Sequence, residues 1–240
     1  MLAVAILGFL LKALSPSILA ADDGELEPLT VAVAANFSAA AQHLARQYSA
    51  EHEEHIVFVT ASTGVLTAQV TRGAPFDVLL AADQERPEKL VRGGFALENA
   101  ECYARGALVL VGAESFSDIY TLGERRIAIA SPRTAPYGRA ALEVLDSLGL
   151  KLPAAQILTG SNVSQAFSFQ QQGSAAFALV AQSLSQEAVL VPEDLYAPVI
   201  QYGVVIRSSD LQPRGKRFLR WLREDRAQQK LVSLGYRRCS

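Results

Sequence analysis

Apolar and polar positions divide this chain into short buried runs separated by amphipathic stretches. Mostly apolar runs, which predict buried strands, occur at residues 29–35, 56–61, 77–82, 107–111, 126–130, 156–158, 175–180 and 198–206. Apolar residues recur at helical spacing over residues 38–51, 64–72, 87–91, 138–148, 163–171 and 214–233. Strands that alternate with helices in this way predict an α/β fold, with mostly parallel sheets flanked by helices.

Two features of the pattern predict two lobes rather than one large domain. The 240 residues suffice for two lobes of about 100 residues each. Glycines lie beside strand-like segments at 103–106 and 201–203, where a hinge could absorb backbone rotation. We therefore expect two crossings between the lobes, with residues 29–104 and 203–240 in lobe 1 and residues 105–202 in lobe 2.

The N-terminal segment has the composition of a cleavable secretory signal over residues 1–21. An apolar run from Leu2 is followed by a Pro-Ser break and by small residues at Ala20 and Ala21. Lys12 interrupts the run too early for a segment that spans a bilayer. No lipid-accepting cysteine follows, so we expect a mature chain that is exported to the periplasm and not inserted in the membrane.

Composition and charge exclude several classes of function. Half of the residues are hydrophobic and 19% are charged, which favours a folded core over disorder. A formal charge of −2 offers no attraction to nucleic acid or to an anionic membrane. The histidines, His43, His52 and His55, lack partners at metal-ligand spacing. The two cysteines, Cys102 and Cys239, are either joined in a disulfide or free.

Polar turns follow four of the predicted strands, each where a helix begins. They lie at residues 34–38, 61–64, 135–138 and 161–164, and they contain hydroxyl and amide groups but no Lys or Arg. Free backbone N–H groups and the positive end of the helix dipole meet at such termini. The sequence therefore predicts a site for a small oxyanion that is held by neutral donors.

Several short motifs resemble those of a known family in their order and spacing. They are Ala-Ser-Thr-Gly-Val-Leu at 61–66, Gly-Ala-Pro-Phe-Asp-Val at 73–78, Ala-Asp at 82–83, Asn-Val-Ser-Gln-Ala at 162–166, and Tyr236. Over residues 29–236 the chain resembles the periplasmic molybdate-binding proteins of ATP-driven (ABC-type) importers. The resemblance implies the two-lobe, type II periplasmic-binding-protein fold, which closes over one molybdate or tungstate ion and delivers it to a membrane permease. It also implies a monomer without a cofactor.

The resemblance places four ligand contacts on this chain. They fall at Asn36, where many relatives have Ser, at Thr63, at Tyr137 and at the backbone of Val163. Molybdenum would be held only as molybdate, through these residues. A tyrosine that closes the site in one branch of the family is absent near Val180, so the phenol of Tyr137 is the candidate replacement.

Other interpretations of the same residues stay open. Asn36 and Thr63 also stand where a helix favours an N-cap. Asp83 suits a structural cap or a bond between the lobes better than a contact to an anion. The ligand could instead be sulfate, phosphate or an organic acid, and Arg133 and Arg139, which flank one turn, keep the last option open.

A hydrolase is the alternative from another class. It would use Ser62 or Thr63 as its nucleophile. No Gly-x-Ser-x-Gly turn surrounds these residues, and no general base can be placed beside them. We therefore expect a binding protein, not an enzyme, with no catalytic residues.

Overall fold

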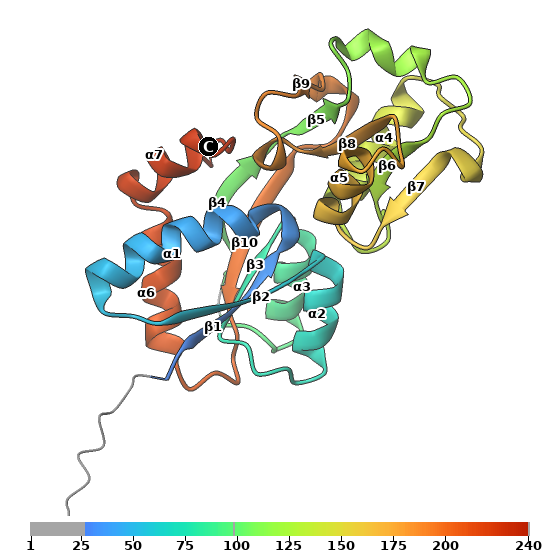
Figure 1. Cartoon of the computed structure of the whole chain (residues 1–240). Helices are drawn as coiled ribbons and strands as arrows, with labels where there is room; N and C mark the ends of the chain where they lie inside the picture. The colour runs from blue at the N-terminus through green and yellow to red at the C-terminus, as the bar shows by residue number, and fades with distance from the viewer. Residues whose placement is uncertain (1–26, 98, 240) are drawn as a thin grey trace, which may run out of the picture.

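The chain folds into two α/β lobes, which Figure 1 shows joined by extended segments. The structure, a computed structural model, describes residues 27–97 and 99–239. The predicted signal segment, residues 1–21, lies outside these ranges. None of the helices within the described ranges combines the length and the apolar character that a membrane crossing needs.

Lobe 1 is built on a five-stranded sheet in the order β2-β1-β3-β10-β4. Its strands are β1 (Leu29–Ala34), β2 (Ile56–Ala61), β3 (Val78–Ala81), β4 (Glu101–Gly106) and β10 (Val199–Val205). Its helices are α1 (Ser38–His52), α2 (Thr63–Thr71), α3 (Glu85–Arg92), α6 (Gln212–Leu222) and α7 (Asp225–Ser233). Side chains alternate across β1: Val31 and Val33 pack with α1, α6 and α7, whereas Ala32 packs with α2 and α3. Helices therefore cover both faces of this sheet.

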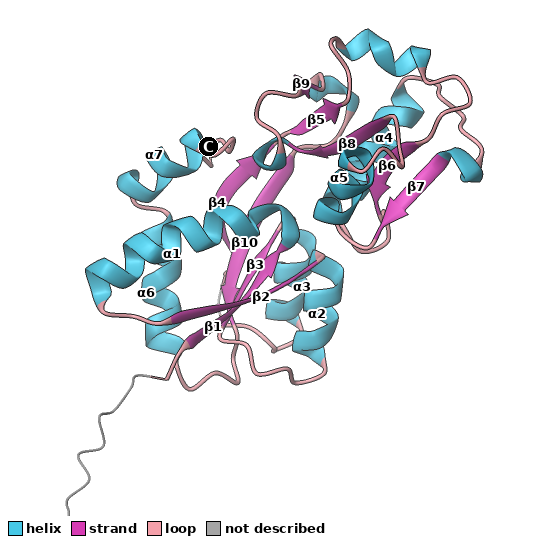
Figure 2. Cartoon of the chain, viewed as in Figure 1, coloured by secondary structure: helices cyan, strands magenta, loops and turns pink. Residues whose placement is uncertain are grey.

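Lobe 2 has a second five-stranded sheet, in the order β7-β6-β8-β5-β9, and Figure 2 shows its helices and strands. Its strands are β5 (Leu108–Val111), β6 (Ile127–Ala130), β7 (Ile157–Gly160), β8 (Phe177–Ala181) and β9 (Val189–Leu190). Its α-helices are α4 (Pro136–Ser147) and α5 (Val163–Gln171). Short 3-10 turns complete the fold: η1 (Ala35–Phe37) in lobe 1, and η2 (Phe116–Thr121), η3 (Ala154–Gln156), η4 (Gln182–Leu184) and η5 (Glu193–Leu195).

The α/β fold with two lobes and two crossings is confirmed, and the pairing within each sheet is more mixed than the mostly parallel sheets that we expected. β1 pairs in parallel with β2 and β3, and β6 pairs in parallel with β7 and β8. β10 and β5 pair with their neighbours in antiparallel fashion. β10 enters lobe 1 from lobe 2, and β5 enters lobe 2 as the continuation of β4. Each of these strands therefore runs opposite to its neighbours in the sheet. The boundaries expected at 104/105 and 202/203 fall within the crossing strands β4 and β10.

The long helix predicted over residues 214–233 is wrong, because α6 and α7 divide this region. α6 ends at Leu222, and Glu224 is extended, with φ −71° and ψ 151°. The carbonyl of Leu222, which the break leaves without a helical partner, accepts a hydrogen bond from Gln228 Nε2 at 2.7 Å. Leu222 and Leu231 both pack in the lobe 1 core, so the turn keeps the apolar sides of both helices against the sheet.

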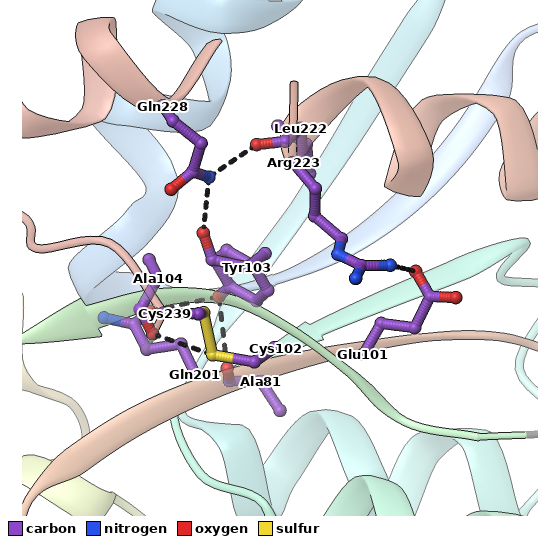
Figure 3. The surroundings of a disulfide bond; sticks show 10 residues. All are labelled: Ala81, Glu101, Cys102, Tyr103, Ala104, Gln201, Leu222, Arg223, Gln228 and Cys239. Atoms are coloured by element: carbon purple, nitrogen blue, oxygen red, sulfur yellow. Dashed lines mark hydrogen bonds and ion pairs between the residues drawn. A yellow bond between two sulfur atoms is a disulfide. The ribbon is translucent and has the colours of Figure 1, made fainter. Parts of the chain in front are cut away.

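A disulfide fixes the segment that follows α7 to β4 (Figure 3). Cys102 of β4 is bonded to Cys239, which resolves the alternative that the sequence left open. Arg237 pairs with Arg105 of β4 through two backbone hydrogen bonds of 2.8 Å. Tyr236 is buried and donates its hydroxyl to a backbone carbonyl of η1 at 2.6 Å. Residues 234–239, which we call the tail, therefore tie the β4 crossing to η1.

Candidate functional site

The N-termini of helices from both lobes meet around one cavity. β1 and β2 of lobe 1, and β6 and β7 of lobe 2, each end at a turn into a helix. The cavity between these ends is lined by Ala34, Ala35, Asn36, Ser62, Thr63, Ala82, Ala135, Pro136, Tyr137, Asn162 and Val163. All four predicted contact residues are buried and line this cavity. The structure thus brings them together, while their contact with a ligand stays a prediction.

The cavity is small. Its volume is about 10 Å³, which is roughly the room that one water molecule needs and far below the roughly 300–1,000 Å³ of sites for drug-sized ligands. Among the residues that the structure describes, no charged side chain lines it. An anion placed there would be held by hydrogen bonds and helix dipoles rather than by an opposite charge.

Most of the helix N-termini at the cavity are open. Within the described chain, α1, α2 and α4 have no side-chain cap. α5 is capped by Asn162, whose Oδ1 accepts the N–H of Gln165 at 3.0 Å. Backbone N–H groups in the first turn of a helix have no acceptor within that helix. We therefore expect the N–H groups of Thr63, Tyr137 and Val163 to be donors to a ligand.

Two neighbouring hydroxyls stand at the start of α2. Thr63 Oγ1 accepts the N–H of Ala82 at 3.0 Å, which leaves its own proton to be donated and shows that it does not cap the helix. Ser62 Oγ is buried and finds no hydrogen-bond partner among the described residues. Sequence reasoning included Ser62 in one of the four donor turns, but named it individually only as the possible nucleophile of a hydrolase. Its place directly after a buried strand, beside a second hydroxyl, was the signal that could have identified it as a ligand donor.

A buried hydrogen-bonded cluster, formed by the side chains of Asn36, Tyr103, Tyr137 and Gln201, links the cavity to the crossing strands. We call it the crossing network. Asn36 Nδ2 and the Tyr103 hydroxyl each donate to Gln201 Oε1 at 3.0 Å. Gln201 Nε2 donates to the Tyr137 hydroxyl at 3.4 Å. The Asn36 amide is thus used within the protein and caps no helix, so we expect Asn36 to offer its backbone N–H to a ligand.

The phenol of Tyr137 lies against the β4 crossing. A Cβ atom on Gly106 would fall 1.8 Å from the Tyr137 hydroxyl, so only glycine leaves room for the phenol. The candidate replacement for the missing tyrosine near Val180 is therefore engaged by Gly106 and Gln201, and Val180 itself is buried in the lobe 2 core. Burial raises the pKa of Tyr137 well above its ordinary value, and neighbouring phenols raise it further. The hydroxyl is therefore neutral at physiological pH.

Charged residues beside the cavity pair across the lobes. Asp83 accepts from Arg139 of lobe 2 at 3.2 Å and also pairs with Arg86 of its own lobe. Arg139 pairs with Glu85 at 2.9 Å, and Arg86 donates to the carbonyl of Arg133 at 3.1 Å. Asp83 thus has the cap and interlobe roles that we expected. Because Arg133 and Arg139 do not line the cavity, the organic-acid alternative loses its cationic partner.

Backbone contacts join the lobes at the cavity itself. The N–H of Gly64 donates to the carbonyl of Thr134 at 2.8 Å. A Cβ atom on Gly64 would lie 3.0 Å from Thr134 Cα and from its carbonyl oxygen. Ser183 Oγ of lobe 2 donates to the carbonyl of Asn36 at 3.0 Å. The lobes are therefore closed on each other around the lining residues.

Comparisons with known proteins agree on one family. The sequence model of the family "Bacterial extracellular solute-binding protein" matches residues 29–237. The molybdate-binding protein ModA of Rhodobacter capsulatus is 33% identical over 217 residues, which cover 85% of this chain and 86% of that protein. ModA of Azotobacter vinelandii is 33% identical over 222 residues, which cover 86% of this chain and 88% of that protein. The solved structure of the Azotobacter vinelandii periplasmic molybdate-binding protein superimposes with a TM-score of 0.84 at 31% identity, over 88% of this chain and 100% of the other. This chain therefore belongs to the bacterial extracellular solute-binding proteins, and within them to the ModA type.

Proposed function

We propose that this chain captures molybdate or tungstate between its lobes in the periplasm and delivers it to the membrane permease of an ABC-type importer. The observation that carries the proposal is the cavity at the helix N-termini, whose described lining offers neutral donors and no charged side chain. The identity of the ion is supported by the relatives, which are named as molybdate-binding proteins. The proposal requires one copy of the chain, no resident cofactor and no catalytic residue.

The donors at the cavity match what a desolvated dianion needs. The candidates are the N–H groups of Asn36, Thr63, Tyr137 and Val163 and the hydroxyls of Ser62 and Thr63. A hydrogen bond to a charged group contributes roughly 1.5–3 kcal/mol, and an ion that left these bonds unmade would lose more by burial than it gains. Several such donors, fixed by two sheets, therefore support tight binding without an opposite charge.

Fixed donors also support selection by size and by protonation. Donors that are held by helix termini cannot follow a smaller ion inward, whereas flexible Lys or Arg side chains could. Sulfate is smaller than molybdate, so it would leave part of the donor set unpaired. Phosphate often carries a proton, which needs an acceptor that a set of donors lacks. Molybdate and tungstate are nearly equal in size, so this arrangement treats them alike.

Closure of the lobes supports the transport role. The contact between Gly64 and Thr134 and the pair between Asp83 and Arg139 both join lobe 1 to lobe 2 beside the cavity. An ion that bonds with donors of both lobes favours this closed arrangement. A permease that docks on the closed form would then distinguish loaded from empty receptors.

Calorimetric titration of the mature chain with molybdate, tungstate, sulfate and phosphate tests the proposal. We expect one-to-one binding of molybdate and tungstate, with sulfate and phosphate at least about a hundredfold weaker, a difference of roughly 2.7 kcal/mol. Tight binding of sulfate or phosphate would keep the site but contradict the assigned ion. Absence of binding by all four would contradict the anion receptor itself.

A further inference from the structure

Gln201, like Tyr103, is a residue of the crossing network that lies on a strand between the lobes. It is 0% exposed and sits in β10 at a register irregularity between Gln201 and Tyr202, where the pairing with β4 shifts. Bulges of this kind re-aim a side chain and are common beside functional sites. A fully buried amide needs hydrogen bonds to offset its lost hydration.

The Gln201 amide bonds with groups from both lobes. Its Oε1 accepts from Asn36, which follows β1 of lobe 1, and its Nε2 donates to Tyr137, which opens α4 of lobe 2. Figure 3 shows Gln201 together with Tyr103, whose hydroxyl also reaches the carbonyl of Ala81 at 3.1 Å. A single side chain thus spans the two turns that carry half of the predicted ligand contacts.

The amide of Gln201 lies close to the β4 crossing at Gly106. A Cβ atom on Gly106 would lie 3.0 Å from Gln201 Nε2 and 1.8 Å from the Tyr137 hydroxyl. The amide of Gln201 and the phenol of Tyr137 thus both lie beside Gly106 of β4. Asn36 and Tyr137 bond with the two polar atoms of this amide, so the group links the turn after β1 to the start of α4.

We propose that Gln201 is a positioning residue that sets the distance between the donors of lobe 1 and those of lobe 2, and thereby the size of tetrahedral oxyanion that the site prefers. The inference rests on the proposed function and deepens it. Gln201 does not line the cavity, so it acts through Asn36 and Tyr137 and not by touching the ion. Without the amide the two turns can approach each other, which favours a smaller ion relative to a larger one.

The test compares two buried glutamines. Gln201→Met keeps the length of the side chain and removes its hydrogen bonds. The matched control is Gln228→Met, because Gln228 is also buried and also bonds with Tyr103, through the carbonyl at 2.9 Å. Its side chain donates to carbonyls of lobe 1, and it is not among the described residues that line the cavity. For each variant and the wild type, titration gives the ratio of sulfate to molybdate dissociation constants, and thermal unfolding gives stability.

We expect Gln201→Met to lower the ratio of the sulfate to the molybdate dissociation constant by at least about tenfold. Gln228→Met should lower stability but leave this ratio unchanged. Loss of stability alone would weaken both ions equally, so the ratio separates positioning from structural support. An unchanged ratio in a folded Gln201→Met overturns the inference. If that variant does not fold, Tyr137→Phe removes only the phenol oxygen that Gln201 bonds. A narrowed ratio in Tyr137→Phe supports the inference, and an unchanged one overturns it. A wild type that binds neither ion contradicts the proposed function before any variant is made.

Discussion

Replacing Ser62 with Ala should weaken ligand binding and at the same time stabilise the empty protein. Ser62 Oγ is buried and has no partner among the described residues. A buried polar group without a hydrogen bond costs about 1–3 kcal/mol, so removing it favours the folded state. When a residue contacts the ligand but does not support the fold, its replacement lowers the affinity for the ligand and raises the stability of the empty protein.

The magnitudes follow from the chemistry of one hydroxyl. A lost hydrogen bond to a charged acceptor costs roughly 1.5–3 kcal/mol, which raises the dissociation constant for molybdate by about 10- to 150-fold. A gain of about 1 kcal/mol in the free energy of unfolding raises Tm by about 2–4 °C in a protein of this size. The larger effect is therefore on binding.

The assay pairs calorimetric titration with thermal unfolding of the ligand-free protein. Ser233→Ala is the control, because Ser233 is exposed at the end of α7 and its hydroxyl bonds with the carbonyl of Lys230. It should change neither quantity. A Ser62→Ala variant with lower Tm and unchanged affinity would falsify the reasoning, since that result belongs to a residue that supports the fold.

Four further outcomes are expected. Thr63→Val should weaken molybdate binding at least about tenfold and lower Tm, since the hydroxyl has a partner within the fold; unchanged affinity in titration would remove Thr63 from the site. Gly64→Ala should weaken molybdate binding, because the added Cβ clashes with Thr134 at a cost of about 1–3 kcal/mol. The Tm of the empty protein should not fall, because Ala favours a helix more than Gly does. An affinity equal to that of the wild type would show that closure does not need this contact. Ser at both Cys102 and Cys239 should lower the free energy of unfolding in urea by about 2–5 kcal/mol, since the bond spans 137 residues; an unchanged midpoint would contradict a stabilising role. Burial raises the pKa values of the phenols in the crossing network above 10.0. As pH rises above about 10, the unfolded chain therefore loses these protons before the folded protein does, and stability should fall. A urea midpoint that stays constant from about pH 8 to about pH 11 would refute this.

Sequence patterns predicted the parts of the fold that local chemistry determines. The strands at 29–35 and 56–61 are continuous apolar runs, and the structure has β1 and β2 there. The turn at 161–164 predicted the start of α5 at Val163. Asn36 and Thr63 lie together because the ends of parallel strands meet at one edge of the lobe 1 sheet, and Tyr137 and Val163 lie together for the same reason in lobe 2. The two pairs meet because the lobes contact each other there.

The features that sequence did not predict depend on contacts between distant segments. The break between α6 and α7 is stabilised by Gln228 and by the shape of the core, and the helical spacing of apolar residues runs straight through it. Gln201 carries no local signal, because its partners lie 165 residues away at Asn36 and 64 residues away at Tyr137. The pairing of Cys102 with Cys239 likewise follows from the path of the tail.

The inner position of β10 makes the sheet of lobe 1 dependent on a segment that is synthesised after lobe 2. The sheet of lobe 2 is drawn from one continuous stretch, β5 to β9, whereas β10 lies between β3 and β4 in the sheet of lobe 1. A nascent chain can therefore assemble lobe 2 while lobe 1 is still missing an inner strand. A product truncated before Tyr236 would lack the hydroxyl that bonds with the carbonyl of Asn36 beside the cavity. We therefore expect a chain to capture its ligand only after its synthesis has reached the tail.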